Sequence, residues 1–228
     1  MFPGPALLFA SLGFAVLSAA IAAVPPELTE ALQHFRAEPP PGWSFSLTTV
    51  GEGKSMVERC DAAKAEFDRW SLMQKDGRPP TPDEAREYAE SRSRRSRGGT
   101  APNVIEQLDL ATLETIAGTA ERTTFRARLK PGDAGDNVAG FLRATIVLHK
   151  PSRTIESLEL MSTGEFSPTF VVKIAEMTTR LTYRPPASDR PSLPDKVETR
   201  VRGRAFLFKS LDADLTVTFS DYVWAGKK

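Results

Sequence analysis

Few side chains in this sequence of 228 residues have the types and spacing that enzyme or metal chemistry requires. His34 and His149 are its two histidines and fall in different predicted elements, so they form no cluster with metal-ligand spacing. Asp212 and Asp214 lie in a predicted turn, where solvation explains them. The sequence contains no nucleophile elbow, phosphate loop or dinucleotide fingerprint. We therefore expect no catalytic residues, metal or cofactor, although a hydrolase built on two carboxylates stays open as an alternative.

Cys60 is the single cysteine of the chain, which excludes an internal disulfide. A lone cysteine is most often a small apolar side chain of the core, and we expect that role here. A reactive or intermolecular thiol is the alternative.

Arginines are concentrated in one short segment that is otherwise rich in serine and glycine. They are Arg92, Arg94, Arg95 and Arg97. Because no aromatic residue stands among them, the pattern is typical of a solvated, flexible linker. Contact with an anionic lipid surface is the alternative interpretation. The formal net charge of the whole chain is only +1, so no nucleic-acid partner is expected.

The N-terminal residues form an uncharged apolar run that ends in small side chains, as in a secretory signal peptide. Ala20, Ile21 and Ala22 fit a cleavage site, so we expect residues 1–22 to be removed and residues 23–228 to form a single mature domain. The run from Ala6 to Val24 is nearly long enough to cross a bilayer, which makes an uncleaved anchor in the inner membrane the alternative. Either way, the remaining chain is expected outside the cytoplasm.

The elements that must position these side chains are predicted to be mainly β-strands. From Val197 to Trp224, apolar and polar residues alternate on both sides of the turn sequence S-L-D-A-D, which predicts a long antiparallel hairpin. The same alternation predicts strands around residues 43–48, 122–129 and 142–149. Further strands are expected near residues 55–60, 70–74, 155–160 and 170–183.

Two helices are predicted beside these strands. The first covers residues 25–36, where one apolar stripe should pack on a sheet: Leu28, Ala31, Leu32 and Phe35. The second begins at Thr81, Pro82 and Glu84, a typical helix start, and runs to about Arg92. Because it is mostly charged, we expect it at the periphery.

The fold class that follows is mainly β (α+β), with a curved antiparallel sheet that forms an unclosed barrel and with the N-terminal and inserted helices as plug or lid. One short helix covers only part of such a sheet, so an apolar concavity should remain. Its lining is expected among bulky residues of the apolar faces, although each of them could instead be ordinary core. They are Trp43, Phe45, Leu47, Trp70, Phe125, Leu129, Phe141, Ile146, Phe166, Phe170, Leu181 and Phe219.

Two passages carry a resemblance to a known family. They are S-R-T-I-E-S-L-E-L-M-S-T-G, residues 152–164, and V-R-G-R-A-F-L-F-K-S-L-D-A-D-L-T-V-T-F-S-D-Y, residues 201–222. With the signal peptide and the N-terminal helix, they resemble the LolA-like superfamily, the periplasmic lipoprotein carriers of Gram-negative bacteria and their relatives. The resemblance covers roughly residues 100–224, whereas about 60–100 form an insertion. It implies a periplasmic half-barrel whose helices cover a cavity for acyl chains.

Three functions remain in competition. The resemblance favours a monomeric, non-enzymatic binding or carrier protein for lipid or lipoprotein acyl chains. The alternative is a structural or interaction module of the cell envelope, with a self-packed sheet whose arginine-bearing face docks an envelope protein. An enzyme that acts on an envelope lipid is the third.

Overall fold

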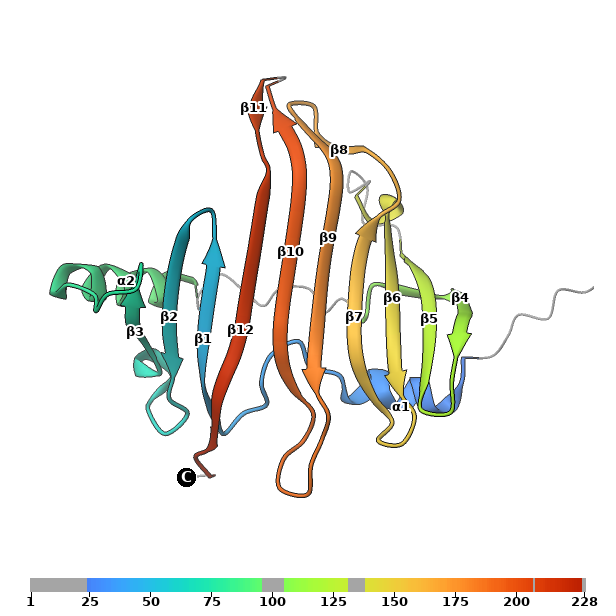
Figure 1. Cartoon of the computed structure of the whole chain (residues 1–228), viewed down its shortest axis with the longest axis horizontal. Coiled ribbons are helices and arrows are strands. Elements are labelled where there is room, and N and C mark those ends of the chain that lie inside the picture. Colours follow the sequence, from blue (N-terminus) through green and yellow to red (C-terminus); the bar gives the residue numbers. More distant parts are fainter. Residues whose placement is uncertain (1–23, 96–104, 131–137, 207, 227–228) are drawn as a thin grey trace, which may run out of the picture.

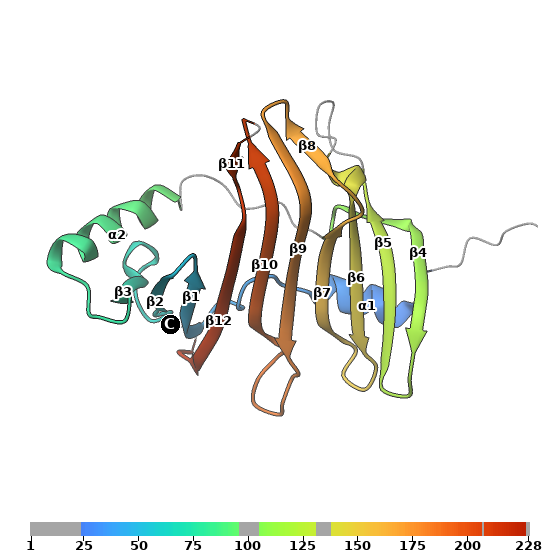
Figure 2. The ribbon, with the colours of Figure 1, turned by 45° about the horizontal axis from the view of Figure 1, so that its top comes forward.

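The computed structural model describes residues 24–95, 105–130, 138–206 and 208–226. They form one curved antiparallel sheet and two α-helices, which confirms the predicted fold class (Figures 1 and 2). The predicted signal peptide (1–22), Arg97 and Leu207 lie outside the described residues. Within the described ranges, no helix is both long enough and apolar enough to span a bilayer.

The sheet has the strand order β3-β2-β1-β12-β10-β9-β7-β6-β5-β4, and two short strands, β8 and β11, extend it beside β9 and β10. The strands are β1 (Trp43–Gly51), β2 (Lys54–Cys60), β3 (Trp70–Lys75), β4 (Leu108–Gly118), β5 (Arg122–Leu129), β6 (Leu142–His149), β7 (Thr154–Ser162), β8 (Phe166–Thr169), β9 (Val172–Arg184), β10 (Leu193–Ala205), β11 (Lys209–Ser210) and β12 (Ala213–Trp224). Short 3-10 turns precede β3 and β6, at Glu66–Asp68 (η1) and Ala139–Phe141 (η2).

Most of the sheet is a meander, but β1 pairs with β12, so the first and last strands are neighbours. The predicted C-terminal hairpin is present as β10 and β12, with Val197 opposite Val217. Strands β3 and β4 are the two edges of the order, and the sheet is not closed into a barrel.

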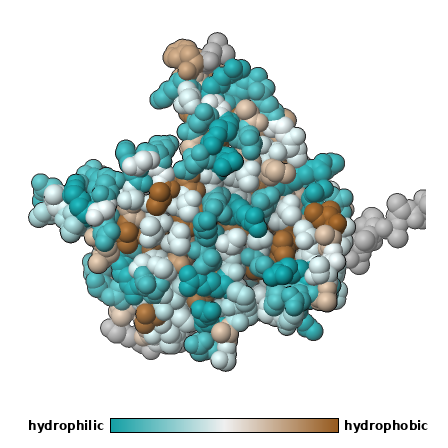
Figure 3. Space-filling model, in the orientation of Figure 1, coloured by the Kyte–Doolittle hydropathy of each residue, from teal (hydrophilic) through white to brown (hydrophobic). Residues whose placement is uncertain are grey.

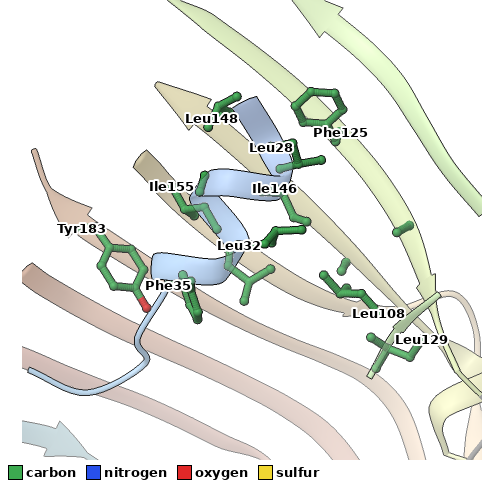
Figure 4. Close-up of a cluster of buried hydrophobic side chains, with 14 of the residues drawn as sticks. Leu28, Leu32, Phe35, Leu108, Phe125, Leu129, Ile146, Leu148, Ile155 and Tyr183 are labelled. Atoms are coloured by element: carbon green, nitrogen blue, oxygen red, sulfur yellow. The ribbon is translucent and has the colours of Figure 1, made fainter. Parts of the chain in front are cut away.

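Helix α1 (Pro26–His34) covers one half of the sheet and builds the main core there (Figure 4). Leu28 is fully buried at its centre, and Phe35 packs edge-on against Tyr183 with ring centroids 5.2 Å apart. The strand residues beneath the helix are Leu108, Phe125, Ala127, Leu129, Leu142, Ala144, Ile146, Leu148, Ile155 and Leu158. This confirms the predicted amphipathic helix, and we call the side of the sheet that it covers the α1 face.

The other half of the α1 face carries a second, smaller apolar cluster. Phe45, Cys60 and Phe219 are buried in it. Partly buried neighbours complete it: Leu47, Trp70, Val197, Val217 and Tyr222. Val197 lies opposite Leu181, which packs against the α1 core, so the two clusters meet on one continuous surface. The face opposite to α1 is mainly hydrophilic (Figure 3).

Helix α2 (Pro82–Arg95) begins with the predicted capping arrangement. The Glu84 backbone N–H donates to Thr81 Oγ1 at 3.3 Å, and Glu84 Oε2 accepts from the Thr81 backbone N–H at 2.9 Å. The predicted flexible linker is wrong for Arg92 to Arg95, because the helix continues through them. Arginine is a good helix former, and Arg92 is held against the sheet by an ion pair with Glu58.

Candidate functional site

A hollow of about 500 Å³ lies on the α1 face, between β1–β3 and the linker that leads from α1 to β1. We call it the aromatic groove. Its floor is apolar and consists of Phe45, Leu47, Cys60, Trp70 and Phe219. Its rim is charged and consists of Glu38, Glu66, Arg69 and Arg92. The linker residues Pro39, Pro40 and Pro41 form one side, and Trp43 lies at the end of the groove.

Phe45 is the central ring of the groove floor. Its ring centroid lies 5.6 Å from that of Trp70, 5.8 Å from that of Tyr222 and 5.9 Å from that of Phe219. These are ordinary aromatic contact distances, so the rings support one another. Leu47 and Trp70 are only half-buried, and they leave apolar surface in the hollow.

A bulge in β12 brings additional aromatic residues to this end of the α1 face. The register between β1 and β12 shifts between Ser44 and Ser46, opposite Asp221, whose φ is +53°. The shift lets Tyr222 join Phe219 on the same side, although simple alternation would separate residues three apart. Tyr222 donates its hydroxyl to Pro194 O at 2.7 Å, which satisfies its polar end.

The linker meets the groove through a close approach at Gly42. Its φ is +90°, and a Cβ there would lie 2.6 Å from the Trp224 ring. Only glycine fits both the backbone conformation and the space. The Ala225 backbone N–H also donates to Gly42 O at 2.9 Å, so the linker is fixed where it reaches β1.

Arg92 of α2 lies over the groove beside a buried carboxylate. Glu58 is 5 % exposed, and its Oε1 accepts hydrogen bonds from the Tyr88 hydroxyl at 2.6 Å and from Arg92 Nη2 at 2.8 Å. The Arg92 guanidinium also stacks 4.0 Å from the Trp70 ring centroid. Burial, together with the bond to Glu58, raises the pKa of the Tyr88 hydroxyl. The hydroxyl therefore stays protonated and donates to Glu58.

Cys60 contributes its thiol to the groove floor. Burial raises its pKa, an effect that Arg69 and Arg92 only partly offset. The thiol is therefore neutral near pH 7 and fits the predicted role of a small apolar side chain.

A second hollow of about 330 Å³ lies beside the C-terminal end of α1. Phe35, Ile155 and Tyr183 line its apolar part, and Pro40 lines both this hollow and the aromatic groove. The linker therefore separates two hollows on one face of the sheet. The buried Tyr183 hydroxyl has no hydrogen-bond partner among the described residues, and burial raises its pKa.

The structure divides the predicted cavity residues into groups. Trp43, Phe45, Leu47, Trp70 and Phe219 line the aromatic groove. Phe125, Leu129, Ile146 and Leu181 pack in or against the core beneath α1. Phe141 and Phe166 stack on each other with ring centroids 5.6 Å apart, away from both hollows. Phe170 is fully exposed in the turn between β8 and β9 and so lies outside the predicted concavity.

Sequence reasoning did not place Arg92, Tyr222 or the proline linker at this site. Three consecutive prolines were visible, but they indicated only the end of a helix. Tyr222 depends on the bulge at Asp221, for which the sequence contains no alternation signal. Arg92 belongs to the segment rich in arginine and serine that the sequence predicted to be a solvated linker. Its position depends on a buried carboxylate on β2, and the sequence did not distinguish Glu58 from a surface residue.

Comparisons with known proteins find one structural likeness. No family model matches the sequence, and no match is found among curated proteins. Among solved structures, the chain is similar to a crystal structure described as a "putative outer membrane lipoprotein-sorting protein domain" from Vibrio parahaemolyticus. The sequence identity is 9% and the TM-score is 0.40, over 89% of this chain and 93% of that chain.

Proposed function

We propose that this chain is a periplasmic binding or carrier protein for amphiphiles with acyl chains, which it holds in the aromatic groove without a catalytic step. The observation that carries the proposal is a hollow whose floor is aromatic and aliphatic and whose rim holds Arg69 and Arg92. We further propose, from the sequence resemblance, that the chain is a distant relative of the LolA-like carriers. A periplasmic location through cleavage of residues 1–22 belongs to the same proposal.

The dimensions and chemistry of the groove suit such a ligand. Ligand pockets typically measure about 300–1,000 Å³, and the groove lies within that range. Each methylene that leaves water for the apolar floor stabilises the complex by about 0.8 kcal/mol. Arg69 can then pair with a phosphate or carboxylate headgroup at the rim.

The packing beneath α1 explains why we place the binding site in the other half of the sheet. Leu28 and its partners fill that half, as a self-packed module would require. Arg92 of α2 reaches over Trp70, but Leu47 and Trp70 are still only half-buried, and their remaining surface is what a ligand would cover.

Ligand capture from cells tests the proposal. Protein expressed from the complete sequence and purified without detergent should release phospholipid, lysophospholipid or lipoprotein acyl chains on solvent extraction and mass spectrometry. Leu47→Asp places a carboxylate on the floor and should weaken binding of the fluorescent fatty acid cis-parinaric acid at least about tenfold, because an ion there loses hydration.

Thr48→Asp is the matched control, since Thr48 is the next residue of the same strand and points to the opposite face. It should bind like the unmodified protein. Equal binding by Leu47→Asp and Thr48→Asp, with no co-purified lipid, would reject the proposal in favour of a self-packed interaction module. Hydrolysis of the added lipid would instead indicate an enzyme.

A further inference from the structure

Three exposed phenylalanines meet at one end of the sheet. Phe170 stands in the turn between β8 and β9 and is 100% exposed. Phe206 and Phe208 lie in the turn between β10 and β11 and are 59% and 88% exposed. The Phe206 backbone N–H donates to Val171 O at 2.8 Å, which holds the two turns side by side. We call these three residues the phenylalanine tip; the two turns form the end of the molecule at the top of Figures 1 and 3.

Exposed cations lie beside the phenylalanine tip. Arg204 and Lys209 directly flank the turn, both are exposed, and neither forms an ion pair within the part of the chain that the structure describes. Lys173 lies opposite Arg204 on β9 and pairs with Glu165 at 2.5 Å. The end of the sheet therefore combines apolar rings with an excess of positive charge.

This surface is poorly suited to a protein partner. Three aromatic side chains can bury at most about 750 Å², below the roughly 800 Å² that each partner of a stable complex buries. The two turns that carry these residues protrude at the end of the sheet (Figure 2), so a flat partner surface would contact little else. A bilayer has no such requirement, because it accepts any apolar group that reaches its interface.

We propose that the phenylalanine tip docks the protein on a bilayer that contains anionic phospholipid. The rings enter the interfacial region, where aromatic side chains are favoured. Arg204 and Lys209 then lie at the depth of the lipid phosphates and are attracted to the negative surface potential. The strand ends that carry the tip are paired, β8 with β9 and β10 with β11.

The tip is separate from the aromatic groove, and the proposal does not depend on the groove binding a ligand. The tip adjoins the beginning of β12, whereas the groove lies beside its later part at Phe219. Along a strand that advances about 3.3 Å per residue, the stretch from Ala213 to Phe219 alone spans roughly 20 Å, and the tip lies beyond Ala213, so the two sites are more than about 20 Å apart.

Vesicle flotation tests the proposal. Protein from the complete sequence is mixed with vesicles of phosphatidylethanolamine and phosphatidylglycerol, or of phosphatidylcholine alone. We expect flotation with the anionic vesicles and a loss of at least about tenfold in partitioning for the triple variant Phe170→Ser, Phe206→Ser and Phe208→Ser. The double variant Arg204→Glu and Lys209→Glu should partition less to the anionic vesicles and equally to those of phosphatidylcholine alone. Added salt should cause the same loss of partitioning to the anionic vesicles for the unmodified protein.

Phe67→Ser is the matched control, because Phe67 in η1 is 72% exposed but lies away from the tip. The Phe67→Ser variant should float like the unmodified protein. All variants should have the same thermal unfolding midpoint as the unmodified protein. The N-terminal apolar run is the same in every variant, so any difference belongs to the tip. Unchanged flotation of the triple variant would overturn the proposal. So would a dimer that light scattering detects for the unmodified protein but not for the triple variant, since the tip would then bind a second copy.

Discussion

Cys60 is a natural reporter of the groove, since its thiol lies in the floor and no other cysteine competes for a label. The thiolate is the reactive form, and burial raises the Cys60 pKa, so less thiolate is present at any pH below that pKa. We expect iodoacetamide to react at pH 8 at least about tenfold more slowly with Cys60 than with free cysteine, whose pKa is about 8.5. The rate should rise only at more alkaline pH.

A bound acyl chain should slow the alkylation of Cys60 further. The measurement is the rate with and without lysophospholipid, followed by mass spectrometry of the intact protein. Cys60→Ser should take up no label. Reaction at the speed of free cysteine, unaffected by lysophospholipid, would mean that the thiol does not lie in a ligand-binding floor.

The ion pair between Arg92 and Glu58 determines how α2 is attached to the sheet. Glu58 is 5 % exposed, so removal of Arg92 leaves a buried carboxylate with Tyr88 as its remaining side-chain donor. Breaking a buried pair from one side is strongly destabilising. Because Arg92 itself is partly exposed, we expect Arg92→Met to lower the free energy of unfolding by about 2–3 kcal/mol.

Urea unfolding of Arg92→Met and Arg86→Met separates this effect from a general loss of charge on α2. Arg86 pairs with Asp83 at the surface of the same helix, and its removal should cost less than about 1 kcal/mol. Adding Glu58→Gln to Arg92→Met should restore part of the stability, because a neutral amide can still bond to Tyr88. Equal losses for the two arginines would contradict a buried pair.

At the scale of elements, α1 supplies the side chains that complete the main core of the sheet. Leu28 is fully buried against strands from β4 to β7. Leu28→Ala should lower the free energy of unfolding by about 2–5 kcal/mol, because the lost transfer energy adds to the cost of a cavity. Leu215→Ala, a change of the same size at a side chain that is 41% exposed, should cost much less.

Thermal and urea unfolding of the two leucine variants measure the difference. A small effect of Leu28→Ala would show that the helix is only loosely attached and that the core beneath α1 is not the main source of stability. The proposed division into a filled half and a ligand-binding half would then fail.

The elements that could be predicted from sequence are those whose signal is local. Strict alternation located β5, β6, β10 and β12, and the stripe around Leu28 located α1. Pairing between β1 and β12 could not be predicted, because it joins the first and the last long strand of the chain and leaves no trace in either segment. The site shows the same limit. Trp43, Phe45 and Phe219 were predictable as apolar, but which hydrophobic residues α1 covers depends on where the helix docks.

Phe170 shows that apolar character alone does not predict burial. It follows β8 in the sequence and was expected to line the concavity, yet it stands in solvent at the turn. The turn, set by the pairing of Thr169 with Val172, leaves no strand neighbour to cover its ring. Phe206 is also exposed in a turn, where its φ of +49° ends the predicted alternation of β10.

At the scale of the whole molecule, the linker from Phe35 to Gly42 connects the filled half of the sheet to the open half. It separates the hollow beside Tyr183 from the aromatic groove, and Pro40 touches both. Leu181 and Val197 continue the apolar surface beneath it from one cluster to the other.

Groove and tip should make separable contributions if the protein carries lipid between membranes. Transfer of a fluorescent phospholipid from donor to acceptor vesicles requires both docking and binding. The phenylalanine-tip triple variant should slow transfer at least about tenfold and leave the affinity for cis-parinaric acid unchanged, because its substitutions lie more than about 20 Å from the groove. Leu47→Asp should slow transfer through weaker binding and leave vesicle flotation unchanged.

The combined variant checks that transfer needs both docking and binding. If docking precedes uptake, the triple variant with Leu47→Asp should transfer no faster than the slower of its two parents. Thr48→Asp and Phe67→Ser, the respective controls, should transfer at the rate of the unmodified protein. Normal transfer by the tip variant would show that lipid exchanges through solution, and normal transfer by Leu47→Asp would show that the carried lipid does not occupy the aromatic groove.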